Sequence, residues 1–227
     1  MKYIIYLFLI CMSKGAFAKQ SCPIKLNNPN IIISVSNEKI NYNYNKTSRE
    51  LRGISDDIDS EDNYKHLLGV FKNNKIQKIN PQISFYGSDN IGYCLVFTKI
   101  NVDIEGEPTI FISREAQRFA CTKHRTEQHE LLHYKFDQEA LERYVNYLNK
   151  DLKRLFKNHF YFRNKQEISS FVESVSKQYL DISKEFSNKY ATPLHKKIDT
   201  NENYKQESSY CSYQENYLLQ KMLERNN

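Results

Sequence analysis

The sequence contains no internal repeat, no low-complexity linker and no long block of like charge. A chain without repeats or linkers is most simply one domain, so we expect residues 19–227 to form a single domain. Basic and acidic residues are interspersed, and the formal net charge is a modest +6. Proteins that bind nucleic acid typically concentrate positive charge on one face. The pattern therefore predicts a solvated surface and no nucleic-acid partner.

No apolar run is long enough to cross a membrane stably. The longest one, Tyr3–Met12, follows Lys2 and precedes the small-residue site Ala16–Ala18. This order is typical of a secretory signal peptide, and the run is shorter than a membrane-spanning helix. We therefore interpret residues 1–18 as a signal peptide. The mature protein is expected to be secreted or periplasmic, with no stable membrane span once the leader is removed.

No Cys-x-x-Cys pair occurs, which argues against a structural zinc–thiolate site. Of the five cysteines, Cys11 leaves with the leader, and four remain. An even number in an oxidising compartment predicts two disulfides, for which three pairings are possible. We favour Cys94 with Cys121, which would tie a strand to the start of a long helix. Cys22 with Cys211 would then join the two ends of the chain.

Three stretches have the alternation of apolar and polar residues that predicts strands, namely residues 31–44, 76–85 and 93–104. Glu105–Gly106 favours a turn. Thr109–Ile112 should then return antiparallel as an edge strand, because Pro108 at its start lacks a backbone donor. Thr47, three residues before Glu50, fits a capping box and predicts a short helix after it.

The strongest chemical signal is the pattern His129-Glu130-x-x-His133. Two histidines four apart lie on one face of an α-helix, where their ring nitrogens can reach one Zn²⁺. Glu130 then falls beside the metal, where it can take a proton from a zinc-bound water as a general base. Apolar residues at helical spacing continue to residue 156, so the pair lies on a long, rigid helix. Further helices are predicted over residues 168–186 and 207–224.

A catalytic zinc needs three protein ligands and an open position. The candidates for the third are the acids and four histidines, which are His66, His124, His159 and His195. We favour His195 because it follows a helix end on a loop that can fold back. Asp137, one turn beyond His133, is expected to orient that histidine or to pair with a lysine. Glu139 is a weaker alternative ligand, and Tyr190 or His124 could stabilise an oxyanion.

The string His129–Asp137, followed by Glu142–Tyr144, resembles an uncharacterised bacterial family of predicted secreted zinc-dependent proteases. In that family an aromatic residue and an acid closely follow the second histidine. Here Tyr134-Lys135 intervenes, so Phe136-Asp137 comes two places later. The paired strands after Cys94 are also similar. A downstream Tyr, Thr, His cluster of the family is resembled by Tyr190–His195, which implies that His195 closes the zinc site.

These observations predict an α+β, zincin-like fold. It would have a small antiparallel or mixed sheet, an edge strand beside a long metal-binding helix, and further helices C-terminal to it. The predicted function is a secreted zinc metallopeptidase that hydrolyses a peptide or protein substrate, with Glu130 as general base. The alternative is a non-catalytic, disulfide-stapled envelope protein that binds a partner or zinc. The sequence gives no indication of the oligomeric state.

Overall fold

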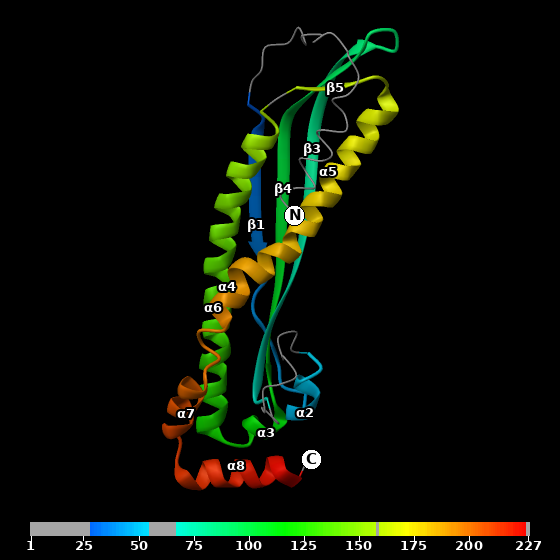
Figure 1. The fold of residues 1–227 in the computed structure, drawn as a ribbon. Coiled ribbons are helices and arrows are strands. Elements are labelled where there is room, and N and C mark those ends of the chain that lie inside the picture. Colours follow the sequence, from blue (N-terminus) through cyan, green and yellow to red (C-terminus); the bar gives the residue numbers. More distant parts are fainter. Residues whose placement is uncertain (1–27, 55–66, 158, 226–227) are drawn as a thin grey trace.

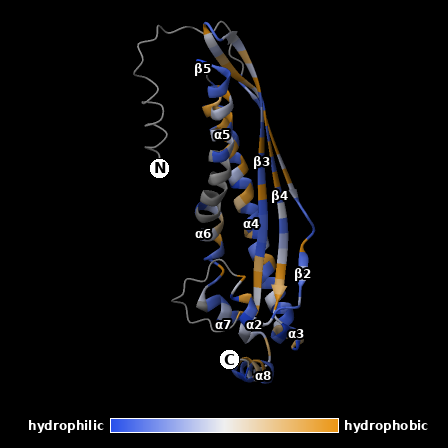
Figure 2. Cartoon of the chain, turned by 90° about the vertical axis from the view of Figure 1, so that its right-hand side faces the viewer, coloured by the Kyte–Doolittle hydropathy of each residue, from blue (hydrophilic) through white to orange (hydrophobic). Residues whose placement is uncertain are grey.

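The computed structural model describes residues 28–54, 67–157 and 159–225. The predicted signal peptide, Cys22 and His66 lie outside these residues. The chain forms an elongated body of two layers, a long sheet and a set of helices, which run side by side (Figure 1). The helices lie on one face of the sheet (Figure 2). The structure is thus mixed α and β, as the sequence predicts.

The sheet has five strands arranged around β4 (Gly92–Ile112). β3 (Gly69–Ser88) pairs antiparallel with β4 along its whole length, and β5 (Phe160–Phe162) pairs antiparallel with its start. β1 (Asn30–Asn37) and β2 (Asn41–Asn43) pair with β4 in parallel. The sheet is therefore not the small antiparallel one that the sequence suggested as an option.

β4 is one continuous strand, so the predicted turn at Glu105–Gly106 is wrong. The alternation that buries Ile100, Val102 and Ile104 continues through Gly106 to Ile112. The prediction that Thr109–Ile112 is an edge strand is also wrong, because β2 and β3 flank this segment. Pro108 is tolerated there because it follows the end of β1 pairing at Gly106 and precedes the start of β2 pairing at Thr109.

Two long helices cover the sheet, α4 (Ala120–Leu155) and α5 (Lys165–Phe186). The second half of α4 buries apolar residues, which are Ala140, Leu141, Tyr144, Leu148 and Leu152. Its first half buries polar ones instead, which are Thr122, Thr126, His129, Glu130, His133 and Asp137. Burying so many polar groups is costly unless they have partners. The inner face of α4 therefore changes along its length from a polar site to a hydrophobic core.

Most of the short helices gather at the end of the body where α4 begins (Figure 1). α2 (Ser48–Leu51) begins with the predicted capping box of Thr47 and Glu50, which is confirmed. α3 (Arg114–Gln117) precedes α4. After α5, the chain continues through a π-helical turn, η1 (Ser187–Ala191), and then α6 (Thr192–His195). The single helix expected over residues 207–224 is two helices, α7 (Asn201–Ser209) and α8 (Tyr213–Arg225).

The cysteine pairing differs from both favoured pairs, because Cys121 is bonded to Cys211. Cys94 is also disulfide-bonded. Cys94 lies at the start of β4, whereas Cys121 starts α4 at the opposite end of the body (Figure 1). α8 lies across that second end, which is why Cys211 meets Cys121. Among the described helices, none combines the length and the apolar character that a membrane crossing requires.

Candidate metal centre

α4 presents the predicted motif on its inner face. His129, Glu130 and His133 are all buried, with exposed fractions of 4%, 5% and 7%. Their position on a regular helix places the two imidazoles one turn apart, with ring centroids separated by 4.9 Å. The two Nε2 atoms lie 3.1 Å apart. The helical prediction for this motif is confirmed.

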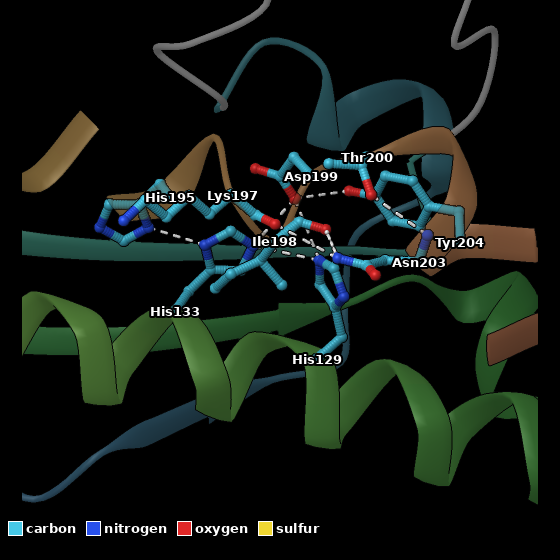
Figure 3. Close-up of polar contacts among 9 residues, drawn as sticks. All are labelled: His129, His133, His195, Lys197, Ile198, Asp199, Thr200, Asn203 and Tyr204. Carbon is cyan, nitrogen blue, oxygen red and sulfur yellow. Dashed lines mark hydrogen bonds and ion pairs between the residues drawn. The ribbon is translucent and has the colours of Figure 1, made fainter. Parts of the chain in front are cut away.

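Asp199 completes a compact group with these two histidines. Its Oδ1 lies 3.1 Å from His129 Nε2 and 3.1 Å from His133 Nε2, so the three atoms form a nearly equilateral triangle (Figure 3). Asp199 lies between α6 and α7, and its carboxylate is 40% exposed. Burial alone would raise the pKa of Asp199, but hydrogen bonds from His129 and His133 outweigh it and lower that pKa well below its usual range.

The spacing of these three atoms suits a metal ion. Ligand atoms at about 2.0–2.1 Å from a tetrahedral Zn²⁺ stand about 3.3 Å from one another, close to the 3.1 Å separations found here. Two imidazoles with one carboxylate are also a donor set that zinc uses in catalytic sites. His129, His133 and Asp199 therefore form a group that could hold zinc.

His195 occupies a different position from the one predicted for it. Its Nδ1 lies 2.7 Å from His133 Nδ1, on the side of the ring opposite to Asp199. The two ring planes are nearly parallel, at 9°, with centroids 4.9 Å apart, so the rings lie edge to edge; the Phe71 ring of β3 lies 6.2 Å from that of His195 at an interplanar angle of 13°. A partner at Nδ1 fixes the orientation and tautomer of a ligand histidine, leaving Nε2 for the metal. His195 thus orients the His133 ring through its Nδ1 atom.

Tyr204 contacts both Asp199 and His129. Its hydroxyl donates to Asp199 Oδ1 at 2.7 Å, and its ring centroid lies 5.0 Å from that of His129. Tyr204 is placed by the first turn of α7, where Thr200 Oγ1 accepts a hydrogen bond from the Asn203 backbone amide. Asn203 Nδ2 in turn donates to the Ile198 carbonyl at 2.9 Å. The start of α7 therefore contacts the Asp199 carboxylate through Tyr204 and the preceding backbone through Asn203.

Glu130 is buried where α4 meets the first residues of β3. Burial raises the pKa of Glu130 to about 7, although the charges of His133 and His129 oppose this rise. Gly69 makes the close approach possible, since a β-carbon there would stand 2.5 Å from Glu130 Oε1 and 2.5 Å from Thr126 Cγ2. A carboxylate whose pKa is near neutrality is suited to general-base chemistry.

The other predicted residues lie elsewhere. Asp137 does not orient His133; it accepts from Asn73 Nδ2 at 2.8 Å and pairs with Lys75, the second of the two roles expected for it. Tyr190 packs against Tyr147, which is about four helical turns beyond His133 on α4. Glu139 pairs with Arg143, and His124 is exposed. His159 precedes β5 at the far end of the sheet.

No protein-family model, no curated protein and no solved structure matches this chain. The resemblance at residues 129–137 therefore rests on the motif itself. Sequence reasoning did not single out Asp199 among the acids, and it missed Tyr204. The signal that could have found them is an acid placed directly before a helix cap, Thr200, with an aromatic residue four positions after that cap.

Proposed function

We propose that this protein is a zinc-dependent metallopeptidase whose metal is held by His129, His133 and Asp199. The observation that carries the proposal is the triangle of Nε2, Nε2 and Oδ1 atoms with 3.1 Å sides. A bound Zn²⁺ would supply a Lewis acid that polarises a carbonyl and makes water a stronger acid. The chain's own groups would hold the metal, move the proton and position the substrate.

Glu130 is the residue proposed to move the proton. It lies next to His129 in the chain, is not part of the triangle, and has a pKa of about 7 because it is buried. At neutral pH a substantial fraction of such a carboxyl group is ionised, so it can accept a proton from water and pass it to the leaving amine. Gly69 and Thr126 confine the carboxylate to this position.

A peptide substrate is supported by the strand beside Glu130. β3 begins at Gly69, pairs with β4 on one side, and has no second partner strand within the described ranges. An extended peptide can add to such an edge through backbone hydrogen bonds. β3 takes the role that the sequence suggested for Thr109–Ile112, which lies between β2 and β3.

The test compares hydrolysis of a peptide library by the wild type and by Glu130→Gln. Glutamine keeps the size of the side chain but cannot accept a proton, so zinc should stay bound while cleavage falls by about two to four orders of magnitude. Glu139→Gln is the matched control, because this carboxylate on the same helix is 44% exposed and pairs with Arg143. A chelator should abolish cleavage by the wild type.

Two results would contradict the proposal. If cleavage survives Glu130→Gln, the proton-transfer role is wrong. If the wild type binds zinc but cleaves no peptide beyond those that Glu130→Gln also cleaves, the protein is a non-catalytic zinc binder. This is the alternative considered from the sequence.

A further inference from the structure

The segment that carries Asp199 and Tyr204 has few buried anchors beyond residue 199. None of the α7 side chains that the structure describes is buried. Downstream of α7, Cys211 and Leu219 are the residues that reach a buried position among those described. Burying one leucine stabilises a segment by only about 1.5–3 kcal/mol. Packing alone is therefore a weak attachment for α7 and α8.

This segment is attached to the first turns of α4 by one disulfide, by two hydrogen bonds and by the Arg125 guanidinium, which lies 4.1 Å from the centroid of the Tyr210 ring. Cys211 is bonded to Cys121 in the first turn of that helix. Glu215 Oε1 accepts from the Thr122 backbone amide at 2.8 Å and from Thr122 Oγ1 at 3.0 Å. The N-cap residue of α4, Phe119, makes no side-chain capping bond, so Glu215 supplies the cap from α8.

We infer that the Cys121–Cys211 disulfide controls the metal affinity of the proposed site by holding α7 in place. Asp199 is fixed on its N-terminal side by buried Ile198 and on its C-terminal side by α7, which the disulfide pins at Cys211. With the disulfide closed, Tyr204 reaches Asp199 Oδ1. With it open, α7 loses its covalent attachment, and the bond from Tyr204 to the ligand carboxylate is lost in most molecules.

The switching step is an ordinary thiol–disulfide exchange. A dithiol reductant attacks one sulfur, the S–S bond breaks, and each cysteine sulfur ends as a thiol. Two electrons and two protons pass to the protein, while the reductant becomes a disulfide. Cys121 is only half-buried, so one of the two sulfurs is on a partly accessible residue.

This inference rests on the proposed metal site, and its expected size follows from the role of Tyr204. Losing a hydrogen-bond partner of a metal ligand typically weakens metal binding 10–100-fold. We therefore expect the zinc Kd of Cys121→Ser/Cys211→Ser to rise by about 10–100-fold. Substitution is preferable to a thiol reductant in this measurement, because the reductant itself binds zinc.

The experiment measures zinc Kd by competition with a chromogenic chelator. The proteins compared are the wild type, the double variant, Tyr204→Phe with the disulfide intact, and Tyr213→Ala. Tyr213 is on α8 and 85% exposed, so its variant should bind zinc like the wild type. Tyr204→Phe should weaken binding to a similar extent as the double variant. Hydrogen exchange should be faster in α7 of the double variant but unchanged in the core of α4.

Each outcome separates the two proposals. If the double variant is folded by circular dichroism and binds zinc as tightly as the wild type, control by the disulfide is wrong while the metal site stands. If the oxidised wild type binds no zinc, or binds it regardless of His129→Ala and His133→Ala, the metal site itself is wrong. Should the double variant not fold, Cys121→Ala/Cys211→Ala replaces it, since it also removes the disulfide but buries no hydroxyl at position 211. Unchanged affinity in that variant, with unchanged exchange in α7, would equally overturn the inference.

Discussion

At the scale of single residues, the site is defined by which nitrogen of each histidine faces which partner. His133 turns Nε2 toward Asp199 and Nδ1 toward His195. The spacing of His129 and His133 was readable from the sequence, because a helix fixes it. Which of His195 and Asp199 meets the two histidines as third ligand could not be read from the sequence. They are four residues apart, and only the path of the chain after α6 decides which one meets the Nε2 atoms.

The pKa of Glu130 leads to a pH-dependent prediction for the metal-free protein. Its folded-state pKa is raised from 4.5 to about 7, chiefly by burial. The stability contributed by the neutral carboxyl is therefore fully present below pH 4.5 and is lost as pH rises through 7. Glu130→Gln has no such loss. The free energy of unfolding of Glu130→Gln, relative to that of the wild type, should therefore increase by up to about 3 kcal/mol between pH 4 and pH 8.

Urea unfolding with a chelator present, at several pH values, measures this difference. A difference that is constant between pH 4 and pH 8 would show that Glu130 is not buried as described.

Gly69 provides a second residue-scale prediction. A β-carbon there would stand 2.5 Å from Glu130 Oε1, whereas at Gly53 it would meet only the Glu50 carbonyl, at 3.6 Å. Gly69→Ala should therefore displace the Glu130 carboxylate and lower kcat by about tenfold or more, the scale of a misplaced catalytic group. KM and zinc content should change little. Gly53→Ala is the matched control, and equal kcat values for the two variants would contradict this role of Gly69.

At the scale of elements, the sequence predicted α4, α5 and the inner face of β4 well because their periodicity is long and regular. It failed at Glu105–Gly106, where a good turn dipeptide is overridden by the apolar alternation on both sides and by pairing with β1 and β3. It contained no strand signal at Phe160–Phe162, whose three residues form β5 because the start of β4 offers a partner. Such short pairings depend on contacts distant in sequence.

The tie between β3 and α4 can be tested at this scale. Asp137 is buried and held by Asn73 and Lys75, so removing it leaves a largely buried ammonium without its carboxylate. Asp137→Ala should lower the free energy of unfolding by about 3 kcal/mol. Glu139→Ala, which removes an exposed carboxylate paired with Arg143, should change it by less than about 1 kcal/mol. Denaturant unfolding at pH 7 distinguishes them, and equal losses would contradict the proposed tie.

At the scale of the whole molecule, the proposed metal site lies where three parts of the chain meet. α4 provides the histidines and Glu130, β3 confines Glu130 through Gly69, and the segment after α6 adds Asp199 and Tyr204. The sequence could identify the first part because its motif is local. The other two depend on how β3 and α7 reach α4. The disulfide at Cys121–Cys211 likewise follows from α8 crossing the end of the body.

The most direct test of the central claim is the zinc content of three proteins after gel filtration: the wild type, Asp199→Ala and His195→Ala. With Asp199 as third ligand, the wild type should hold about one zinc per chain and Asp199→Ala should lose it. His195→Ala should still bind zinc when it is supplied in excess, with affinity weakened about 10–100-fold, because His195 acts through His133. If Asp199→Ala instead keeps its zinc as tightly as the wild type while His195→Ala cannot bind it, the metal centre described here is wrong.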